Sequence, residues 1–206
     1  MRFDESRAAA ARHPLVVYRT PSTRSPLASF PTYDAWGVQT VFAVLAERLD
    51  AACRLQWLRV QLPIVPNGSS GWVRPHDVKL SKLTKRIVVD VSQKRLYLYK
   101  AGRLVFQSPA AVGKPSTPTP LGRFYVNQRL IPADQYGAYG PRALGVAAHS
   151  TVLRSWVDGG PIGIHGTNER FSIGRPVSHG CIRLPNAAIL RLFSVTPLGT
   201  PVIVRR

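Results

Sequence analysis

The sequence predicts a mainly β protein with two domains. Pro (18) and Gly (16) are frequent, and long stretches of helical periodicity are rare. Short apolar or alternating segments are instead separated by turn residues, which is the pattern of many short strands. Apolar residues make up 45% of the 206 residues, so the chain has enough material for buried cores. This length suits one large domain or two small ones.

The first part of the chain has a weakly patterned start followed by β-like segments. Residues 1–13 are polar and rich in Ala and Arg, so we expect a short helix or a frayed, flexible N-terminal segment. Residues 14–81 form the first expected domain. Its expected strands are residues 15–18, 40–45 (strand or short helix), 57–62 and 71–73. The Pro- and Ser-rich residues 20–31 predict a loop, and Pro66-Asn67-Gly68-Ser69 predicts a turn.

The end of this region resembles a bacterial SH3-like domain, on the segments WLRVQLP and NGSSGWV. We therefore expect a small SH3-like β-barrel over residues 14–81. Strand periodicity favours a core position for Trp57 and Trp72, and a platform for a sugar is the alternative. Cys53 lies in an apolar stretch, and we expect it to be an inert core residue.

Residues 81–85 are short and polar, and they predict a linker to a second domain over residues 85–206. Three expected strands at residues 87–91, 95–99 and 104–106 make a β-meander with tight turns. Further strands are expected at residues 122–126, 162–165 and 201–204, and a helix at 186–193. Residues 115–120 form a Pro/Thr-rich loop. The long loop 130–145, rich in Gly, Pro and Tyr, is typical of a binding element or lid.

The charge balance predicts a polyanionic partner. Lys and Arg number 28 against 10 Asp and Glu, a formal net charge of +18. Up to Leu83 the counts are 11 and 6, and after it they are 17 and 4, so the second part is the more basic. Nucleic acid, anionic lipid and an acidic cell-wall polymer all fit such a surplus, and a generally basic surface is the alternative. No apolar stretch reaches about 18 residues, so no transmembrane segment is expected.

The chemistry-bearing residues gather in residues 162–186, which contain two histidines and the second of two cysteines. A catalytic cysteine needs a base or a positive environment, because the thiolate is the reactive form. His165 is the candidate base for Cys181. Arg183 adds positive charge and carries a planar fork that suits a substrate carboxylate. Gly180 permits close approach of a substrate, and the amides around Cys181 are candidates for an oxyanion hole.

This segment resembles the L,D-transpeptidase catalytic domain family (YkuD). The family signature is a His, a gap, Ser or Thr followed by His-Gly-Cys, and then an Asn. The residues at these places are His165, Ser178, His179, Gly180, Cys181 and Asn186. His165-Gly166-Thr167 and the segment TPLGRF at 119–124 also agree with the family pattern. The likeness extends over residues 86–206.

The resemblance implies a YkuD-type β-sandwich and a mechanism. Cys181 would attack the carbonyl between an L-centre and a D-residue of a peptidoglycan stem peptide, with His165 as base and later as acid. The thioester would pass to an acceptor amine, most often in a 3→3 cross-link, or to water. The third member of the site would be the backbone carbonyl of Gly166. Asp158 and Glu169 are the carboxylates that offer an alternative.

The resemblance also implies further site residues and partners. His179 would shape the oxyanion site. Substrate contacts are expected from Ser178, Gly180, Arg183, Asn186 and Thr167, with Tyr125, Tyr139 and His149 as pocket walls. No metal or organic cofactor is needed. The expected partners are stem peptides, an anionic cell-wall polymer and carbapenem-type β-lactams that acylate Cys181.

Several alternatives stay open. Taken alone, Cys181 is also consistent with a buried structural cysteine. Together with His165 and His179 it is also consistent with a zinc site that lacks a visible fourth ligand. Arg183 can be a surface charge, and Ser178 and Asn186 can be turn or cap formers. An L,D-carboxypeptidase, a non-catalytic wall-binding protein and a nucleic-acid binder are the rival functions. The last has no RNP-like, helix-turn-helix or finger pattern behind it.

The expected location is outside the cytoplasmic membrane, because that is where peptidoglycan lies. The start of the sequence, MRFDESRAAAARHPLVVYRTPS, lacks the apolar core of a secretory signal. Export is therefore expected from the substrate alone.

Overall fold

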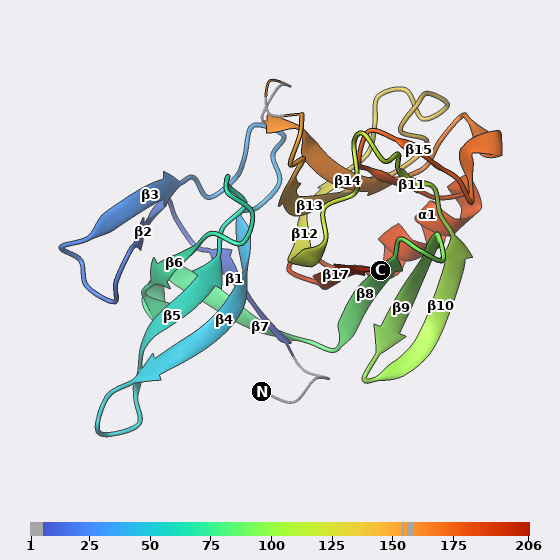
Figure 1. Ribbon diagram of the computed structural model, residues 1–206. Coiled ribbons are helices and arrows are strands. Elements are labelled where there is room, and N and C mark those ends of the chain that lie inside the picture. Colours follow the sequence, from blue (N-terminus) through green and yellow to red (C-terminus); the bar gives the residue numbers. More distant parts are fainter. Residues whose placement is uncertain (1–5, 154, 156–158) are drawn as a thin grey trace.

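The computed structural model describes residues 6–153, 155 and 159–206, which form two β domains side by side (Figure 1). The N-terminal domain covers residues 6–83, and the second domain follows it directly. The prediction of a mainly β protein is confirmed.

The N-terminal domain is a seven-stranded sheet in the order β3-β2-β6-β5-β4-β1-β7, with every neighbouring pair antiparallel. Its elements are β1 (Ser6–Ala11), β2 (Leu15–Tyr18), β3 (Pro26–Phe30), β4 (Val41–Leu49), β5 (Leu55–Gln61), β6 (Ser70–Val73), the 3-10 helix η1 (Pro75–Asp77) and β7 (Val78–Leu83). The SH3-like character of this domain stays a prediction.

Two segments of this domain differ from the sequence-based expectation. Residues 6–11 are strand β1 and lie between β4 and β7, so the expected helix or frayed segment is wrong there. Alanine is a poor strand former, but hydrogen bonds to partners on both sides and the burial of Ala8, Ala9 and Ala11 outweigh that local preference. The expected loop at residues 20–31 likewise contains strand β3, which pairs with β2.

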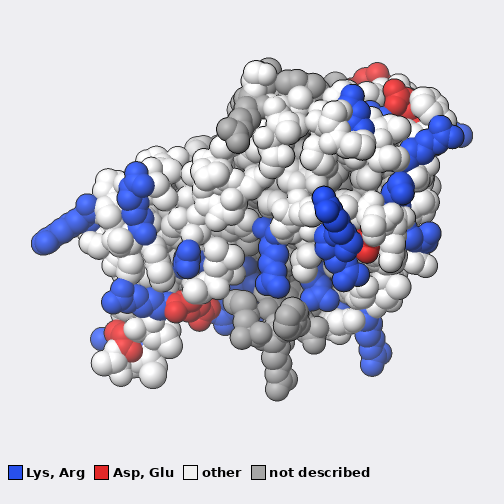
Figure 2. All heavy atoms as spheres, viewed as in Figure 1, with Lys and Arg blue, Asp and Glu red and all other residues white. Residues whose placement is uncertain are grey.

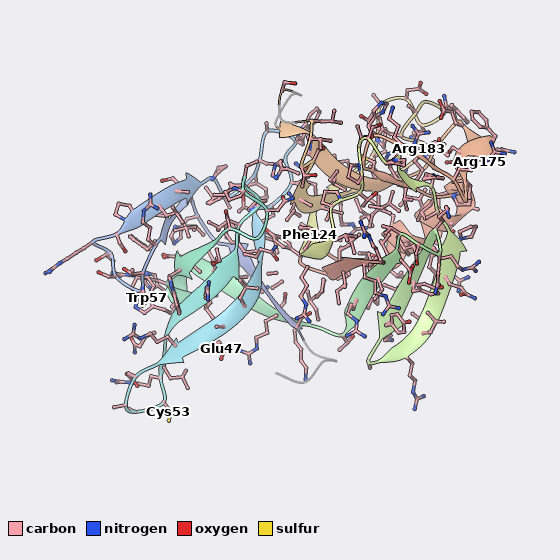
Figure 3. The ribbon with its side chains drawn as sticks, in the orientation of Figure 1. Glu47, Cys53, Trp57, Phe124, Arg175 and Arg183 are labelled. Atoms are coloured by element: carbon pink, nitrogen blue, oxygen red, sulfur yellow. The ribbon has the colours of Figure 1, made fainter. Side chains whose placement is uncertain are left out.

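The two faces of the N-terminal sheet carry different side chains. Leu58, Val60 and Val73 point into the core, as strand alternation requires. Trp57 and Trp72 therefore lie on the opposite, partly exposed face, and the prediction that they belong to the core is wrong. Cys53 is exposed at the tip of the β4–β5 hairpin and is not a core residue either, because it lies in the turn (Figure 3).

The second domain is an eight-stranded mixed sheet in the order β10-β9-β8-β17-β12-β13-β14-β16, with a small β11–β15 pair beside it. Its elements are β8 (Lys85–Asp90), β9 (Arg95–Lys100), β10 (Arg103–Pro109), β11 (Val112–Gly113), β12 (Gly122–Leu130), β13 (Ala143–His149), β14 (Pro161–His165), η3 (Arg170–Ser172), β15 (Pro176–Ser178), β16 (Ile182–Arg183), α1 (Asn186–Val195) and β17 (Pro201–Arg205). The expected meander and helix are confirmed. The expected 130–145 loop is shorter, because β12 continues to Leu130 and β13 begins at Ala143.

The eight strands curl around one core that helix α1 closes (Figure 1). This core takes side chains from both ends of the sheet, for example Leu98 of β9 and Ile182 of β16. On β14, Ile162 and Ile164 point into the core. The alternate residues Gly163 and His165 therefore face outward.

The two domains are joined tightly. The expected linker at residues 81–85 is wrong, because only Thr84 separates strands β7 and β8. The Asn67 side chain donates to the His149 carbonyl and accepts from its amide, at 2.8 Å each. The Gln128 amide donates to the Asp34 carboxylate at 2.8 Å. These paired polar contacts hold the N-terminal domain against strands β12 and β13.

The surface agrees with the basic composition. Figure 2 shows Lys and Arg side chains spread over the visible face of both domains, with few Asp and Glu among them. In the part of the chain that the structure describes, no helix has the length and apolar character needed to cross a membrane.

Candidate active site

His165 ends strand β14, and a backbone carbonyl holds its ring. Nδ1 lies 2.6 Å from the carbonyl oxygen of Gly166. A carbonyl only accepts, so Nδ1 carries the proton of the neutral ring and Nε2 is left as the acceptor. The side chain is 4% exposed, and the Tyr139 ring packs against it at 4.9 Å between centroids. Burial lowers the pKa of His165 to about 4, so the ring is neutral at physiological pH.

The carboxylates weighed as alternative partners of His165 do not provide this contact. The Glu169 side chain instead accepts from the Arg183 guanidinium at 2.5 Å. Asp158 lies outside the described residues. The ring contact expected from the family pattern, to the Gly166 carbonyl, is therefore present in the structure.

Cys181 lies beside strand β14, and its Sγ faces the strand backbone. Sγ accepts from the Gly163 amide at 3.4 Å and lies 3.9 Å from the Pro161 carbonyl oxygen. Burial raises the pKa of the Cys181 thiol, while the Gly163 amide and the Arg183 charge act in the opposite direction. The direction that prevails is upward, so the resting group is a thiol and not a thiolate.

Gly163 is a site residue that the sequence reasoning missed. A Cβ placed on it would lie 3.8 Å from Cδ2 of His165, and its amide reaches Sγ of Cys181. Gly163 therefore lies close to both the imidazole of His165 and the sulfur of Cys181. Sequence position could have indicated Gly163, because it lies two residues before His165 and therefore on the same face of the strand.

The turn that carries Cys181 is held by Ser178. The buried Ser178 hydroxyl donates to the Cys181 carbonyl at 2.6 Å and accepts from the Gly180 amide at 3.1 Å. Gly180 has φ +119°, a conformation that L side chains rarely adopt. The Gly180 amide already donates to the Ser178 hydroxyl, so it is not available to a substrate. Any oxyanion hole must therefore use other amides near Cys181.

The Pro/Thr-rich loop supports the same turn from the other side. The Thr117 hydroxyl donates to the Ser178 carbonyl at 3.0 Å, and the Thr119 hydroxyl donates to the Gly180 carbonyl at 2.9 Å. Thr119 also accepts from the Gly113 amide at 2.9 Å. The sequence reasoning used Thr119 only as part of the family pattern. The structure shows that these two buried hydroxyls brace the backbone before Cys181.

Asn186 and Thr167 position the other half of the site. The Asn186 Oδ1 accepts from the Thr167 amide at 2.8 Å, and the buried Thr167 hydroxyl accepts from the Glu169 amide at 3.0 Å. Any Cβ on Gly166 would lie 2.4 Å from Asn186 Oδ1. The Asn186 side chain therefore locks the turn that presents the Gly166 carbonyl to His165.

Arg183 lies next to His165 through strand pairing. Strand β16 runs parallel to β14, with His165 opposite Arg183 in the register. Backbone hydrogen bonds between Arg183 and Ala111 fix this short strand on its other side. Burial lowers the pKa of His165 and the Arg183 charge adds to that effect, whereas at Cys181 the same charge acts against the burial that raises the pKa of the thiol. In this position the guanidinium of Arg183 can stabilise negative charge that develops near Cys181 during a reaction.

The expected pocket-wall residues divide into two kinds. Tyr139 is more than half exposed and packs on His165, so it lies at the mouth of the site. Tyr125 is fully buried on β12 and offers no surface to a substrate, which differs from the expectation. Its isolation from water raises its pKa. His149 lies at the domain junction through its contacts with Asn67, and His179 is exposed next to the Cys181 turn.

The zinc alternative needs a cluster of ligand side chains. Among residues 6–153, 155 and 159–206, no three His, Cys, Asp or Glu side chains are grouped so that they could hold a metal ion. The geometry instead pairs one histidine with one backbone carbonyl and one thiol with one backbone amide.

Known proteins resemble this chain over the second domain. Residues 84–204 match the family model of the L,D-transpeptidase catalytic domain (YkuD). The putative L,D-transpeptidase YkuD of Bacillus licheniformis is 40% identical over 122 residues, which cover 58% of this chain and 64% of that protein. Its namesake in Bacillus subtilis is 37% identical over 123 residues, which cover 58% and 65%. The chain thus spans less than two thirds of these relatives.

A solved L,D-transpeptidase in complex with imipenem is 19% identical to the chain, with a TM-score of 0.48 and coverage of 97% of this chain and 82% of that one. The family model covers more than half of the 206 residues. The chain therefore belongs to the L,D-transpeptidase (YkuD) family of cysteine-dependent enzymes.

Proposed function

We propose that the chain joins peptidoglycan stem peptides through a thioester on Cys181 and that its main product is a 3→3 cross-link. The observation that supports this most is the His165 ring, whose Nδ1 is held by the Gly166 carbonyl and whose Cδ2 lies near Gly163, the residue whose amide contacts the Cys181 sulfur. This arrangement gives a thiol a neutral base with a defined acceptor nitrogen.

The first half of the reaction forms the thioester. Nε2 of His165 takes the proton from Cys181, and the Gly163 amide and Arg183 stabilise the resulting thiolate. The sulfur attacks the carbonyl between the L-centre and the D-residue of the donor stem. The proton on Nε2 then passes to the leaving nitrogen, so the D-residue departs with a neutral amine and the acyl group stays on sulfur.

The second half transfers the acyl group to an acceptor. An incoming amine loses its proton to Nε2 and attacks the thioester, and the sulfur leaves with that proton as the thiol. With water as acceptor the same steps release a shortened stem, which is L,D-carboxypeptidase activity. Arg183, whose guanidinium is held by Glu169, is the proposed contact for a substrate carboxylate beside the nucleophile.

The same proposal covers location and inhibitors. A stem-peptide substrate places the enzyme outside the cytoplasmic membrane, where the net charge of +18 attracts it to acidic cell-wall polymer. A carbapenem presents a strained acyl group to the same thiol, so it is expected to acylate Cys181.

The experiment is product analysis after incubation with a disaccharide-tetrapeptide, by liquid chromatography and mass spectrometry. The expected product is a dimer that has lost one terminal D-residue. Cys181→Ala and His165→Gln should abolish it, and Cys53→Ser, which changes the exposed cysteine, should not. Only a shortened monomer would mean that water is the acceptor. Equal product from Cys181→Ala would overturn the proposal.

A further inference from the structure

The N-terminal domain has a pocket away from the candidate active site. It has a volume of about 480 Å³, which falls within the range of roughly 300–1,000 Å³ for small-molecule sites. Its lining comes from β5 and the segment after β6, namely Leu55, Gln56, Trp57, Arg74, Pro75 and His76. Figure 3 shows Trp57 in the N-terminal sheet and Arg183 in the second domain, well separated.

Aromatic and basic side chains share the sheet face around this pocket. The core takes Leu58, Val60 and Val73, so the alternate residues of β5 and β6 face outward. Strand register sets these outward residues opposite one another. The pairs are Tyr18 with Trp72, Arg59 with Trp72, and Arg48 with Trp57. The face is thus a plane of rings interleaved with guanidinium groups.

The contacts of Trp57 make it the centre of this arrangement. The Tyr18 ring meets it edge-on at 5.6 Å between centroids, and the Arg74 guanidinium lies 5.7 Å from its centroid. These contacts fix the indole in place before any ligand arrives, which reduces the ordering cost of binding. Trp57 is also partly exposed, so it remains available on the pocket side.

The charged groups around the pocket favour an anionic ligand. Two carboxylates near its lining are already engaged. Asp50 accepts from Arg54 and Gln56, and Asp77 lies within 3.1 Å of His76 and 3.4 Å of His13. The Arg74 guanidinium lies over the Trp57 ring. A ligand with an apolar sugar face and a carboxylate therefore fits the indole and the guanidinium together.

We propose that this pocket binds an acidic amino-sugar chain, the glycan of the polymer whose stem peptides the second domain processes. The class of ligand rests on the proposed function, and the site rests on the pocket and its side chains. Binding here holds glycan on the N-terminal domain, which the polar contacts at the domain junction keep in a set position relative to the active site.

The test uses the full chain and two probes in calorimetry. One is peptidoglycan glycan freed of stem peptides, which carries a carboxylate on every second sugar, and the other is neutral chitin oligosaccharide. The wild type should prefer the acidic glycan. Trp57→Leu should weaken both by about tenfold or more, since ring anchors dominate such sites. Arg74→Gln should weaken only the acidic glycan and so remove the preference.

Matched controls lie outside the pocket. Trp36→Leu changes an exposed ring on the β3–β4 loop and Arg24→Gln an exposed guanidinium on the β2–β3 turn, and both should bind like the wild type. Carbapenem acylation of Cys181 should be unchanged in every variant, which checks folding. If Trp57→Leu fails to acylate, Arg74→Gln alone decides.

Three outcomes would overturn the inference. They are no glycan binding by an acylating wild type, equal binding by the pocket variants, and preferential binding of single-stranded DNA that the same variants abolish. The last would make this face a nucleic-acid surface. Glycan binding without acylation would instead leave the pocket standing and defeat the proposed function, so the two failures are distinguishable.

Discussion

The burial of neutral His165 links the stability of the protein to pH. The pKa of His165 is 6.5 in an unfolded reference and about 4 in the folded chain. Between these values the unfolded chain binds a proton that the folded chain does not, so stability falls as the pH is lowered. The stability that the folded chain gains from keeping His165 neutral is fully present above about pH 6.5 and is lost as the pH falls to about 4. The gap between the unfolded and folded pKa values of His165 corresponds to about 3 kcal/mol in the free energy of unfolding.

The assay is urea unfolding of wild type and His165→Gln at several pH values between about 7 and about 4. Glutamine stays neutral, so its variant should lose less stability over this range, by about 3 kcal/mol. Groups such as Asp90, whose hydrogen bonds to Gln93 and Ser92 lower its pKa, contribute equally to both proteins and cancel. An identical pH dependence in the two proteins would refute the assignment of a buried neutral ring.

Three further predictions follow from the site. Arg183→Gln removes a charge that lowers the pKa of Cys181, so the pH profile of iodoacetamide alkylation, followed in a Cys53→Ser background, should shift to higher pH. Thr119→Val removes a buried hydroxyl that joins two backbone groups, and chemical unfolding should show a loss of about 1–3 kcal/mol. Asn186→Ala frees the turn after His165, so carbapenem acylation should slow while thermal stability changes little, and an unchanged rate would contradict its positioning role.

Local patterns in the sequence predicted much of the second domain. Apolar runs bounded by turn residues place strands such as β8, β9 and β14 close to their observed bounds. The contact between His165 and the Gly166 carbonyl also followed from the family pattern, because it joins neighbouring residues. Strands and contacts between neighbouring residues can be predicted without a structure because they depend on residues close together in the sequence.

The missed features depend on partners distant in the sequence. Strand β1 is a run of alanines that becomes a strand because β4 and β7 flank it. Thr119 meets the Gly180 carbonyl across 61 positions, and Gly163 meets Cys181 across 18. For Trp57 the strand was predicted correctly, but the side chain was assigned to the buried face and lies on the opposite one.

The site combines a neutral thiol with a neutral base in the resting state. Burial acts on both groups in the direction that disfavours charge, and Arg183 and the Gly163 amide favour the thiolate. Proton transfer from Cys181 to His165 is therefore expected on substrate binding and not before it. This distinguishes the site from one with a preformed thiolate–imidazolium pair.

The most direct test of Cys181 as the nucleophile is intact-protein mass spectrometry after incubation with a carbapenem, with peptide mapping of the adduct. Wild type and Cys53→Ser should each gain the mass of one inhibitor molecule on Cys181, and Cys181→Ala should gain none. His165→Gln should form the adduct far more slowly. A folded wild type that stays unmodified, or an adduct that persists in Cys181→Ala, would contradict the account.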